Sequence, residues 1–82
     1  MESTTAAVDG GLVERVRLGR LPSPATRASI RRGARVSLKD MGTELGVTSM
    51  TILRWESGKA EPRLENAIAY RRLLDQLREA TA

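Results

Sequence analysis

Apolar residues recur along this chain at the spacing of short amphipathic helices. Leu38, Met41 and Leu45 follow the i, i+3, i+7 order that puts side chains on one face, which predicts a helix over residues 38–45. A longer periodic segment covers residues 64–80. Its apolar positions are Leu64, Ala67, Ile68, Leu74 and Leu77, with Tyr70 and Leu73 widening the stripe. The pattern predicts an all-α fold, a compact bundle of four to five helices.

A helix start is recognisable earlier in the chain. Ser23 followed by Pro24 predicts a helix over residues 25–32 that ends at Gly33. The side chains expected to face inward from it are Ala25, Ala28 and Ile30.

The N-terminal residues give a weaker signal. Leu12, Val13 and Val16 suggest a short helix over residues 12–18, whereas residues 1–10 are small and polar without periodicity. The organisation we expect is a disordered tail over residues 1–10, a weak helix and linker over residues 11–22, and one folded domain over residues 23–82.

Residues 36–56 have the layout of two helices around a tight turn. Ser37 and Thr48 each occupy a position favoured for an N-cap, and Gly46 between them is suited to end the first helix in the left-handed conformation. Gly42 lies inside that first helix, which indicates that a neighbouring helix crosses too close for a larger side chain. This layout is a helix-turn-helix, a motif typical of DNA-binding proteins.

The residue inventory excludes several classes of function. The chain has no cysteine and no histidine, so disulfides, Cys-His or Ser-His nucleophiles and the usual zinc sites are absent. Its central acids lie on separate elements and form no acid–base pair, so we expect no enzyme, no metal and no cofactor. The longest apolar runs fall far short of the roughly 20 residues of a membrane span, and the N-terminus lacks a signal-peptide pattern. We therefore expect a soluble, cytoplasmic protein without a membrane partner.

The basic charge is concentrated in the middle of the chain. Acidic and basic residues balance in residues 1–22 and again in residues 64–82, so the net charge of +4 lies in residues 23–63. The basic residues there are Arg27, Arg31, Arg32, Arg35, Lys39, Arg54, Lys59 and Arg63. Such a segment attracts a polyanion, although a solvated basic surface has the same composition.

A specific combination of residues occupies this central segment. It consists of Gly42, Gly46 with Val47, Ile52, the run from Arg54 to Gly58, and Pro62. The combination resembles the Xre or Cro/repressor-type helix-turn-helix proteins of phages and bacteria, and the resemblance covers about residues 23–77. It implies a lambda-repressor-like domain that binds double-stranded DNA in the bacterial cytoplasm or nucleoid.

Two positions depart from the pattern of that family. Members often carry Gln where this chain has Leu38, and the phosphate contact of that Gln is then missing. They commonly carry Ala where this chain has Gly42, which implies closer packing or a less stable helix.

Helical spacing assigns roles within the helix that follows Thr48. If Ile52 faces the core, the 3.6-residue period leaves the opposite face outward, toward the major groove. The candidates for base contacts are Ser49, Met50, Thr51 and Arg54. Arg54 is the strongest of them because a guanidinium makes two hydrogen bonds with guanine O6 and N7. The alternative for Arg54 is a phosphate contact without sequence specificity.

Four further residues are candidates for phosphate contacts. Thr48 stands at a helix N-terminus, where free backbone N–H groups attract anions. In the resembling family the loop after this helix follows the sugar-phosphate backbone, which implies such contacts for Lys59 and Arg63. Lys39 is the fourth candidate, with a solvated lysine as the alternative.

Two charged residues are expected to be structural. In the resembling family an arginine of the first helix pairs with a glutamate near the end of the recognition helix, and the matching positions are Arg31 and Glu56. Removing one partner of a buried pair costs about 3 to 5 kcal/mol. Trp55 is expected to be a partly buried packing residue.

The wide stripe of residues 64–80 has two interpretations. It closes the core of one chain, or part of it meets a second copy or another protein. The candidate residues for that contact are Tyr70, Leu73, Leu74 and Leu77. A second candidate surface is formed by Leu12, Val13 and Val16. Because one recognition helix contacts only a few base pairs, we expect a homodimer on two half-sites.

The predicted function is therefore a non-enzymatic, sequence-specific DNA-binding protein, a transcriptional regulator of the repressor type. One alternative is an antitoxin or phage accessory protein that uses the scaffold for contacts with a protein partner on its C-terminal helix. Another is a phage excision protein that bends its DNA site.

Overall fold

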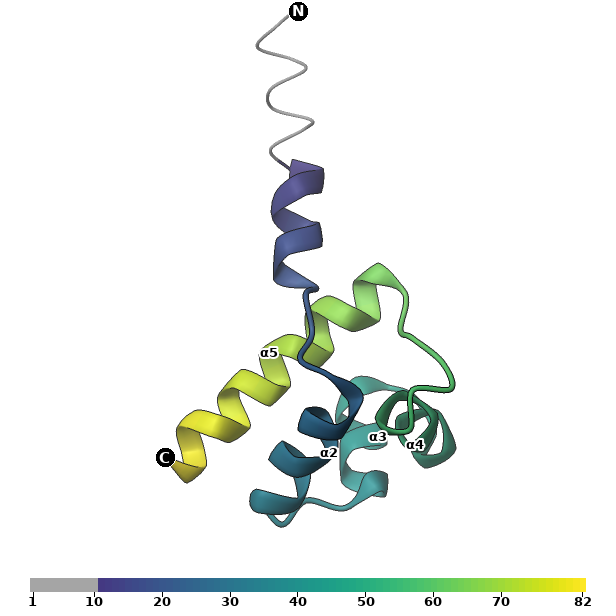
Figure 1. The fold of residues 1–82 in the computed structure, drawn as a ribbon, viewed down its shortest axis with the longest axis vertical. Coiled ribbons are helices and arrows are strands. Elements are labelled where there is room, and N and C mark those ends of the chain that lie inside the picture. Colours follow the sequence, from purple (N-terminus) through teal and green to yellow (C-terminus); the bar gives the residue numbers. More distant parts are fainter. Residues whose placement is uncertain (1–10) are drawn as a thin grey trace, which may run out of the picture.

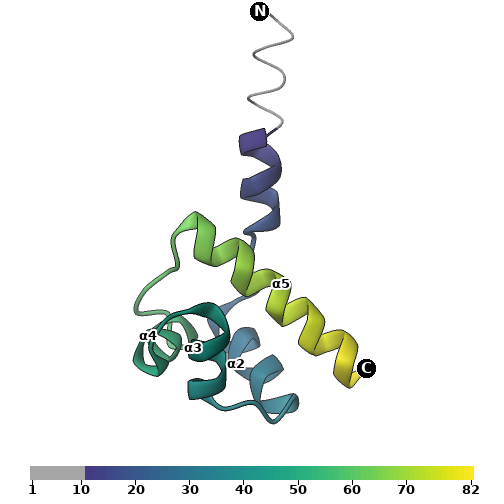
Figure 2. The ribbon, with the colours of Figure 1, turned by 180° about the vertical axis from the view of Figure 1, so that it is seen from behind.

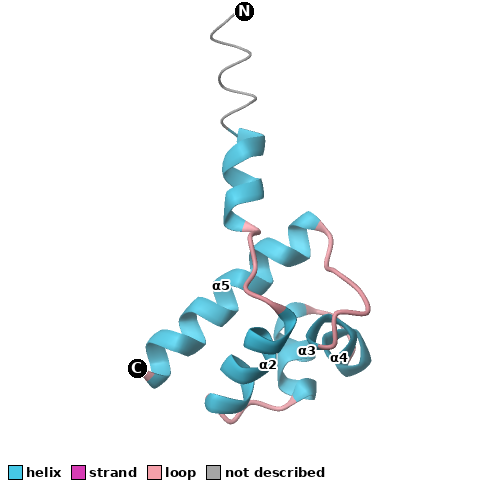
Figure 3. Ribbon diagram, viewed as in Figure 1, coloured by secondary structure: helices cyan, strands magenta, loops and turns pink. Residues whose placement is uncertain are grey.

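The computed structural model describes residues 11–82, and every regular element within them is a helix (Figure 3). The elements are a helix at residues 11–18, α2 (Pro24–Gly33), α3 (Leu38–Leu45), α4 (Ser49–Glu56) and α5 (Leu64–Thr81). For the described residues this confirms the predicted all-α bundle of four to five helices. The tail expected at residues 1–10 lies outside the described part of the chain.

The helices lie on two sides of α5. Helix α5 crosses the molecule diagonally, with α2, α3 and α4 grouped together below it (Figure 1). The helix at residues 11–18 stands on the opposite side of α5 and points away from the group, as the reverse view also shows (Figure 2). The helix-turn-helix therefore belongs to a three-helix group that is closed on one side by α5.

Local capping residues define where α2, α3 and α4 begin. The side chains of Ser23, Ser37 and Thr48 each accept a hydrogen bond from the backbone N–H three residues later. At α3 the cap is reciprocal, because Asp40 accepts the backbone N–H of Ser37 in return. Serine, threonine and aspartate are favoured at these positions because they satisfy N–H groups that the helix leaves free. All three predicted helix starts are confirmed.

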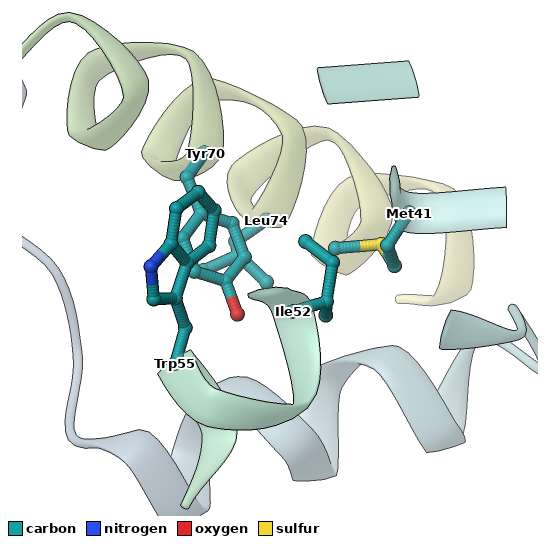
Figure 4. Packing of buried hydrophobic residues seen from close by; sticks show 5 residues of the cluster. All are labelled: Met41, Ile52, Trp55, Tyr70 and Leu74. Atoms are coloured by element: carbon teal, nitrogen blue, oxygen red, sulfur yellow. The ribbon is translucent and has the colours of Figure 1, made fainter. Parts of the chain in front are cut away.

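Five buried side chains form the core between α5 and the helix-turn-helix (Figure 4). They are Met41 from α3, Ile52 and Trp55 from α4, and Tyr70 and Leu74 from α5. The rings of Trp55 and Tyr70 lie 5.2 Å apart between centroids, a spacing typical of packed aromatic pairs. The core thus joins α4 to α5 through their side chains.

The hydroxyl of Tyr70 lies inside this core. It is fully buried, and within residues 11–82 no side chain or backbone group makes a hydrogen bond with it. Burial, reinforced by the nearby carboxylate of Glu56, raises the pKa of Tyr70 to about 12. The ring stabilises the core by packing, while its hydroxyl is a polar group without a partner, which costs free energy.

The structure corrects the candidate contact surface on α5. Tyr70 and Leu74 are 0% and 1% exposed, so the prediction that they meet a second copy or a partner protein is wrong. The physical reason is that their face of α5 closes the core of the chain itself. Leu73 and Leu77 are half-buried and pack against the edge of that core.

The inward face of α2 also differs from the prediction. Ala28 is buried and Ile30 packs against the core, as expected. Ala25 is exposed, and its assignment to the inward face is wrong. The buried face of α2 is marked by Arg27 and Ala28, and Ala25 lies about half a turn away from Arg27.

Candidate nucleic-acid interface

The turn between α3 and α4 depends on two glycines. Gly46 has a φ of 72°, in the left-handed region that favours glycine, and the backbone N–H of Val47 donates to the carbonyl oxygen of Gly42 at 2.8 Å. A Cβ on Gly42 would lie 2.6 Å from the carbonyl oxygen of Val47 and 3.2 Å from the nitrogen of Ser49. The close approach inferred from the sequence therefore comes from the turn itself and from the first residue of α4.

Helix α4 is anchored on one face and exposed on the other. Ile52, Trp55 and Glu56 are buried. The exposed positions on the opposite side include Ser49, Met50, Leu53 and Arg54, of which Met50 and Leu53 are 61% and 44% exposed. Three of the four candidates for base contacts thus lie on one outward surface. Leu53 belongs to the same surface, although it was not among those candidates.

Thr51, the fourth candidate, is half-buried and tied to the helix cap. Its backbone N–H donates to the Thr48 hydroxyl at 3.1 Å, and the two hydroxyl oxygens lie 3.0 Å apart. These two threonines hold each other at the start of α4. Thr48 remains exposed beside the N-terminus of the helix.

Arg31 and Glu56 form a two-armed ion pair between α2 and α4. Nε of Arg31 donates to Oε2 of Glu56 at 2.6 Å, and a terminal nitrogen donates to Oε1 at 3.0 Å. Their side chains are only 12% and 4% exposed. Hydrogen bonding to Glu56 raises the pKa of Arg31 above its ordinary value. The pair orients the C-terminal end of α4 on the bundle.

A second arginine, Arg27, has an internal role that the sequence did not reveal. Its residue is 4% exposed, and its guanidinium donates to the carbonyl oxygens of Pro22 and Trp55 and to the carboxylate of Glu61. Arg27 therefore does not belong to the exposed charge that attracts a polyanion. Nothing in its sequence context separates it from the exposed arginines, because its partners come from distant segments.

The remaining basic residues of the central segment are exposed. They are Arg32, Arg35, Lys39, Arg54, Lys59 and Arg63, and within residues 11–82 none of them forms an ion pair. The two internal pairs remove two arginines and two glutamates together, so the segment keeps its excess of +4. That excess lies in solvent, where it attracts anions.

The first residue of α3 differs from the exposed residues around it. Leu38 is half-buried and packs against the core, so it offers no polar group to a ligand. Lys39, next to it, is exposed. Because Leu38 stands where the family often has Gln, the start of α3 lacks a side-chain amide that could hydrogen-bond to a phosphate.

Helix 11–18 presents the largest exposed apolar residues outside α4. Leu12, Val13 and Val16 are about half exposed, at 53%, 49% and 52%. The side that faces α5 carries Arg15, which pairs with Glu65, and Leu18. Leu12 and Val16 lie one turn apart on a different side, so this apolar face is turned away from the body of its own chain.

The comparisons with known proteins identify one family. A family model described as Helix-turn-helix (HTH_3) matches residues 28–79, more than half of the chain. Neither the curated proteins nor the solved structures contain a significant match. Among the helices that the structure describes, none has the length and apolar character needed to cross a membrane.

Proposed function

Because the chain belongs to the Xre and lambda-repressor-type helix-turn-helix family, we propose that it is a sequence-specific regulator of transcription, a non-enzymatic repressor that acts on double-stranded DNA. The observation that carries this proposal is the outward face of α4. It holds an exposed arginine, small polar residues and exposed apolar side chains on a helix whose other face is fixed in the core. The location that we propose with this function is the cytoplasm or nucleoid of a bacterium.

The outward face of α4 enters the major groove in this proposal. Arg54 makes two hydrogen bonds with a guanine, and Met50 contacts a thymine methyl group. Ser49 and Thr51 contribute hydrogen bonds to bases near the start of the helix. Helix α4 is anchored in the core by Ile52 and Glu56, so these groups are already held in place before DNA binds. No mobile segment has to become ordered, which lowers the entropic cost of binding.

Phosphate contacts orient the helix in the groove. Thr48 and the N-terminus of α4 face one strand, and Lys59 and Arg63 in the segment after α4 follow the backbone. Lys39 contributes from the start of α3. These contacts position the protein and are the source of its salt dependence.

A second copy of the chain completes the binding unit. The surface that supports this part of the proposal is the apolar face of Leu12, Val13 and Val16. A separate groove of about 220 Å³ lies where the end of this helix meets α5, and it is lined by Leu18, Ile68, Arg71, Arg72, Asp75, Gln76 and Glu79. A surface with an apolar centre and charges of both signs is suited to pair with its own copy across a two-fold axis.

A salt titration of DNA affinity tests the proposed function. With six exposed basic residues in the central segment, affinity should fall by roughly two orders of magnitude or more between about 50 and 200 mM salt. Replacing the base-contacting arginine, Arg54→Ala, should reduce the preference for the selected site by about 1 to 3 kcal/mol. The charge-matched control is Arg78→Gln, at the exposed end of α5, and should keep that preference. Affinity that hardly changes with salt would contradict the proposal.

Sedimentation of the pure protein tests the homodimer. The double variant Leu12→Ser with Val16→Ser should shift the protein from dimer to monomer, whereas Ala25→Ser, an exposed apolar residue on α2, should leave the dimer intact. A wild-type chain that sediments as a monomer would instead favour a protein partner on the same apolar face.

A further inference from the structure

Helices α3 and α4 end in the same backbone arrangement. In α3 the backbone N–H of Val47 reaches back to the carbonyl oxygen of Gly42, and the residue between them in the turn, Gly46, has a φ of 72°. In α4 the corresponding left-handed residue is Gly58, with a φ of 76°. Glycine is the favoured residue there because it has no Cβ to meet the neighbouring carbonyl group.

Helix α2 ends in the same arrangement with an arginine in the left-handed position. The backbone N–H of Val36 donates to the carbonyl oxygen of Arg31 at 3.2 Å, and that of Arg35 donates to Arg32 at 3.0 Å. Arg35 has a φ of 60° and is the only residue other than glycine with a positive φ in the described part of the chain. A long side chain is thus kept where glycine would relieve backbone strain.

The Arg35 side chain is not used inside the protein. It is exposed, and within residues 11–82 it makes no hydrogen bond or ion pair, in contrast to the arginines Arg27 and Arg31 of α2. Arg32 and Lys39, on either side of it in the chain, are also exposed. The next acid along the chain, Asp40, lies in the cap of α3. Three basic residues against this one acid leave the corner between α2 and α3 with an excess of positive charge.

This corner leads directly into the first helix of the helix-turn-helix. In Figures 1 and 2 the linker runs along the lower end of the bundle into α3. In the docking geometry of this motif the first helix crosses the DNA backbone while the second enters the groove. Leu38, the first residue of α3, packs against the core and offers no contact to that backbone.

We propose that Arg35 contacts a DNA phosphate and supplies the anchor that Leu38 does not provide. The inference rests on the proposed DNA-binding function. Arg35 has a left-handed backbone at the α2–α3 corner, and Lys39, a second exposed basic residue, follows it at the start of α3. The positive φ of Arg35 lowers the stability of the local backbone, and the same residue places a positive charge at the edge of the DNA.

The variant Arg35→Gly separates this role from a structural one, because glycine suits the left-handed position. The probe is a fluorescent mixed-sequence duplex of about 25 base pairs, long enough for two half-sites. We expect Arg35→Gly to melt at the same or a higher temperature than the wild type. Its affinity for the duplex should fall roughly five- to tenfold, and the slope of log affinity against log salt should decrease by about 0.9, the value for one phosphate contact.

Two further variants complete the design. Arg35→Lys keeps the charge and should retain most of the salt slope, while Arg78→Gln removes an exposed charge from α5 and should bind as the wild type does. An Arg35→Gly protein with wild-type affinity and salt slope would overturn the inference and leave the proposed function standing. A lower melting temperature together with lower affinity would also overturn it, since the loss would then come from the fold. A wild type that binds no duplex would overturn both.

Discussion

Helix α4 and the helix at residues 11–18 are both short, and both expose large apolar side chains, yet their settings are opposite. Helix α4 buries Ile52, Trp55 and Glu56, whereas every residue of the other helix is exposed. When a helix is anchored in the core, its exposed face is held in one position before a ligand binds. An exposed face on a helix that buries nothing depends on a partner for its stability, because short isolated helices are marginal in water.

Removing the anchor of α4 should give the largest effect. Glu56→Ala leaves the buried guanidinium of Arg31 without its carboxylate, and we expect the free energy of unfolding to fall by about 3 to 5 kcal/mol. The matched control is Glu61→Ala, which breaks the pair with Arg27 from a partner whose side chain is 60% exposed. It should cost no more than about 1 kcal/mol, because water can replace this exposed carboxylate and Arg27 keeps its hydrogen bonds to the carbonyl oxygens of Pro22 and Trp55. Urea unfolding of both variants measures the difference, and equal losses would contradict the anchoring role of Glu56.

The close turn that places α4 on α3 gives the next effect. Gly42→Ala should destabilise the protein by about 1 to 3 kcal/mol, because the new Cβ meets the backbone of Val47 at a distance that requires a shift. In α2, Gly33 has no neighbour within 4 Å of the corresponding position. Gly33→Ala should therefore stabilise the protein by about 0.5 to 1 kcal/mol. Thermal unfolding compares the two, and a stabilised Gly42→Ala variant would show that the turn has room for a side chain.

The core beneath α4 offers a smaller and pH-dependent effect. Tyr70→Phe removes a buried hydroxyl without a partner and should leave stability unchanged or raise it by about 1 kcal/mol at neutral pH. The pKa of Tyr70 is raised from 10.0 to about 12, so the folded state favours the neutral phenol. The associated stability is present below pH 10 and is lost as the pH rises toward about 12. Melting temperatures over that range should fall more steeply for the wild type than for Tyr70→Phe, and parallel curves would contradict the burial of the hydroxyl.

The smallest effect on monomer stability is expected in helix 11–18. Leu12→Ser with Val16→Ser should change the free energy of unfolding of the monomer by no more than about 0.5 kcal/mol, since neither side chain contacts the core. Amide hydrogen exchange should find this helix open and α4 protected when the protein is dilute. Strong protection of both helices in a monomer would show that the helix 11–18 is anchored by its own chain.

The parts of this fold that follow local rules were accessible from the sequence. Ser37, Gly46 and Thr48 fix the ends of α3 and α4 through short-range hydrogen bonds, so the helix-turn-helix and its family were recognisable. Leu38 was identified as a departure from the family, and its packing against the core gives that departure a physical basis.

The parts that depend on distant contacts were not accessible. Tyr70 and Leu74 belong to a stripe that looked suited to a second copy, and only the position of α5 over α4 shows that they close the core. Arg27 looks like any other arginine of its segment until Trp55 and Glu61 are brought beside it. Arg35 was missed for a different reason: the hydrogen bonds that give it a left-handed backbone are local, at the end of α2, but an arginine carries no glycine or asparagine signal for that conformation.

The most direct measurement for the role of α4 is selection of bound sequences from random duplex DNA, carried out with the wild type and with Arg54→Ala. For the wild type we expect a short half-site containing a guanine, repeated with two-fold symmetry at a spacing of about 10 base pairs or a multiple of it. For Arg54→Ala the preference at that guanine should disappear while overall binding persists. A wild-type pool without any enriched sequence would contradict sequence-specific binding by α4.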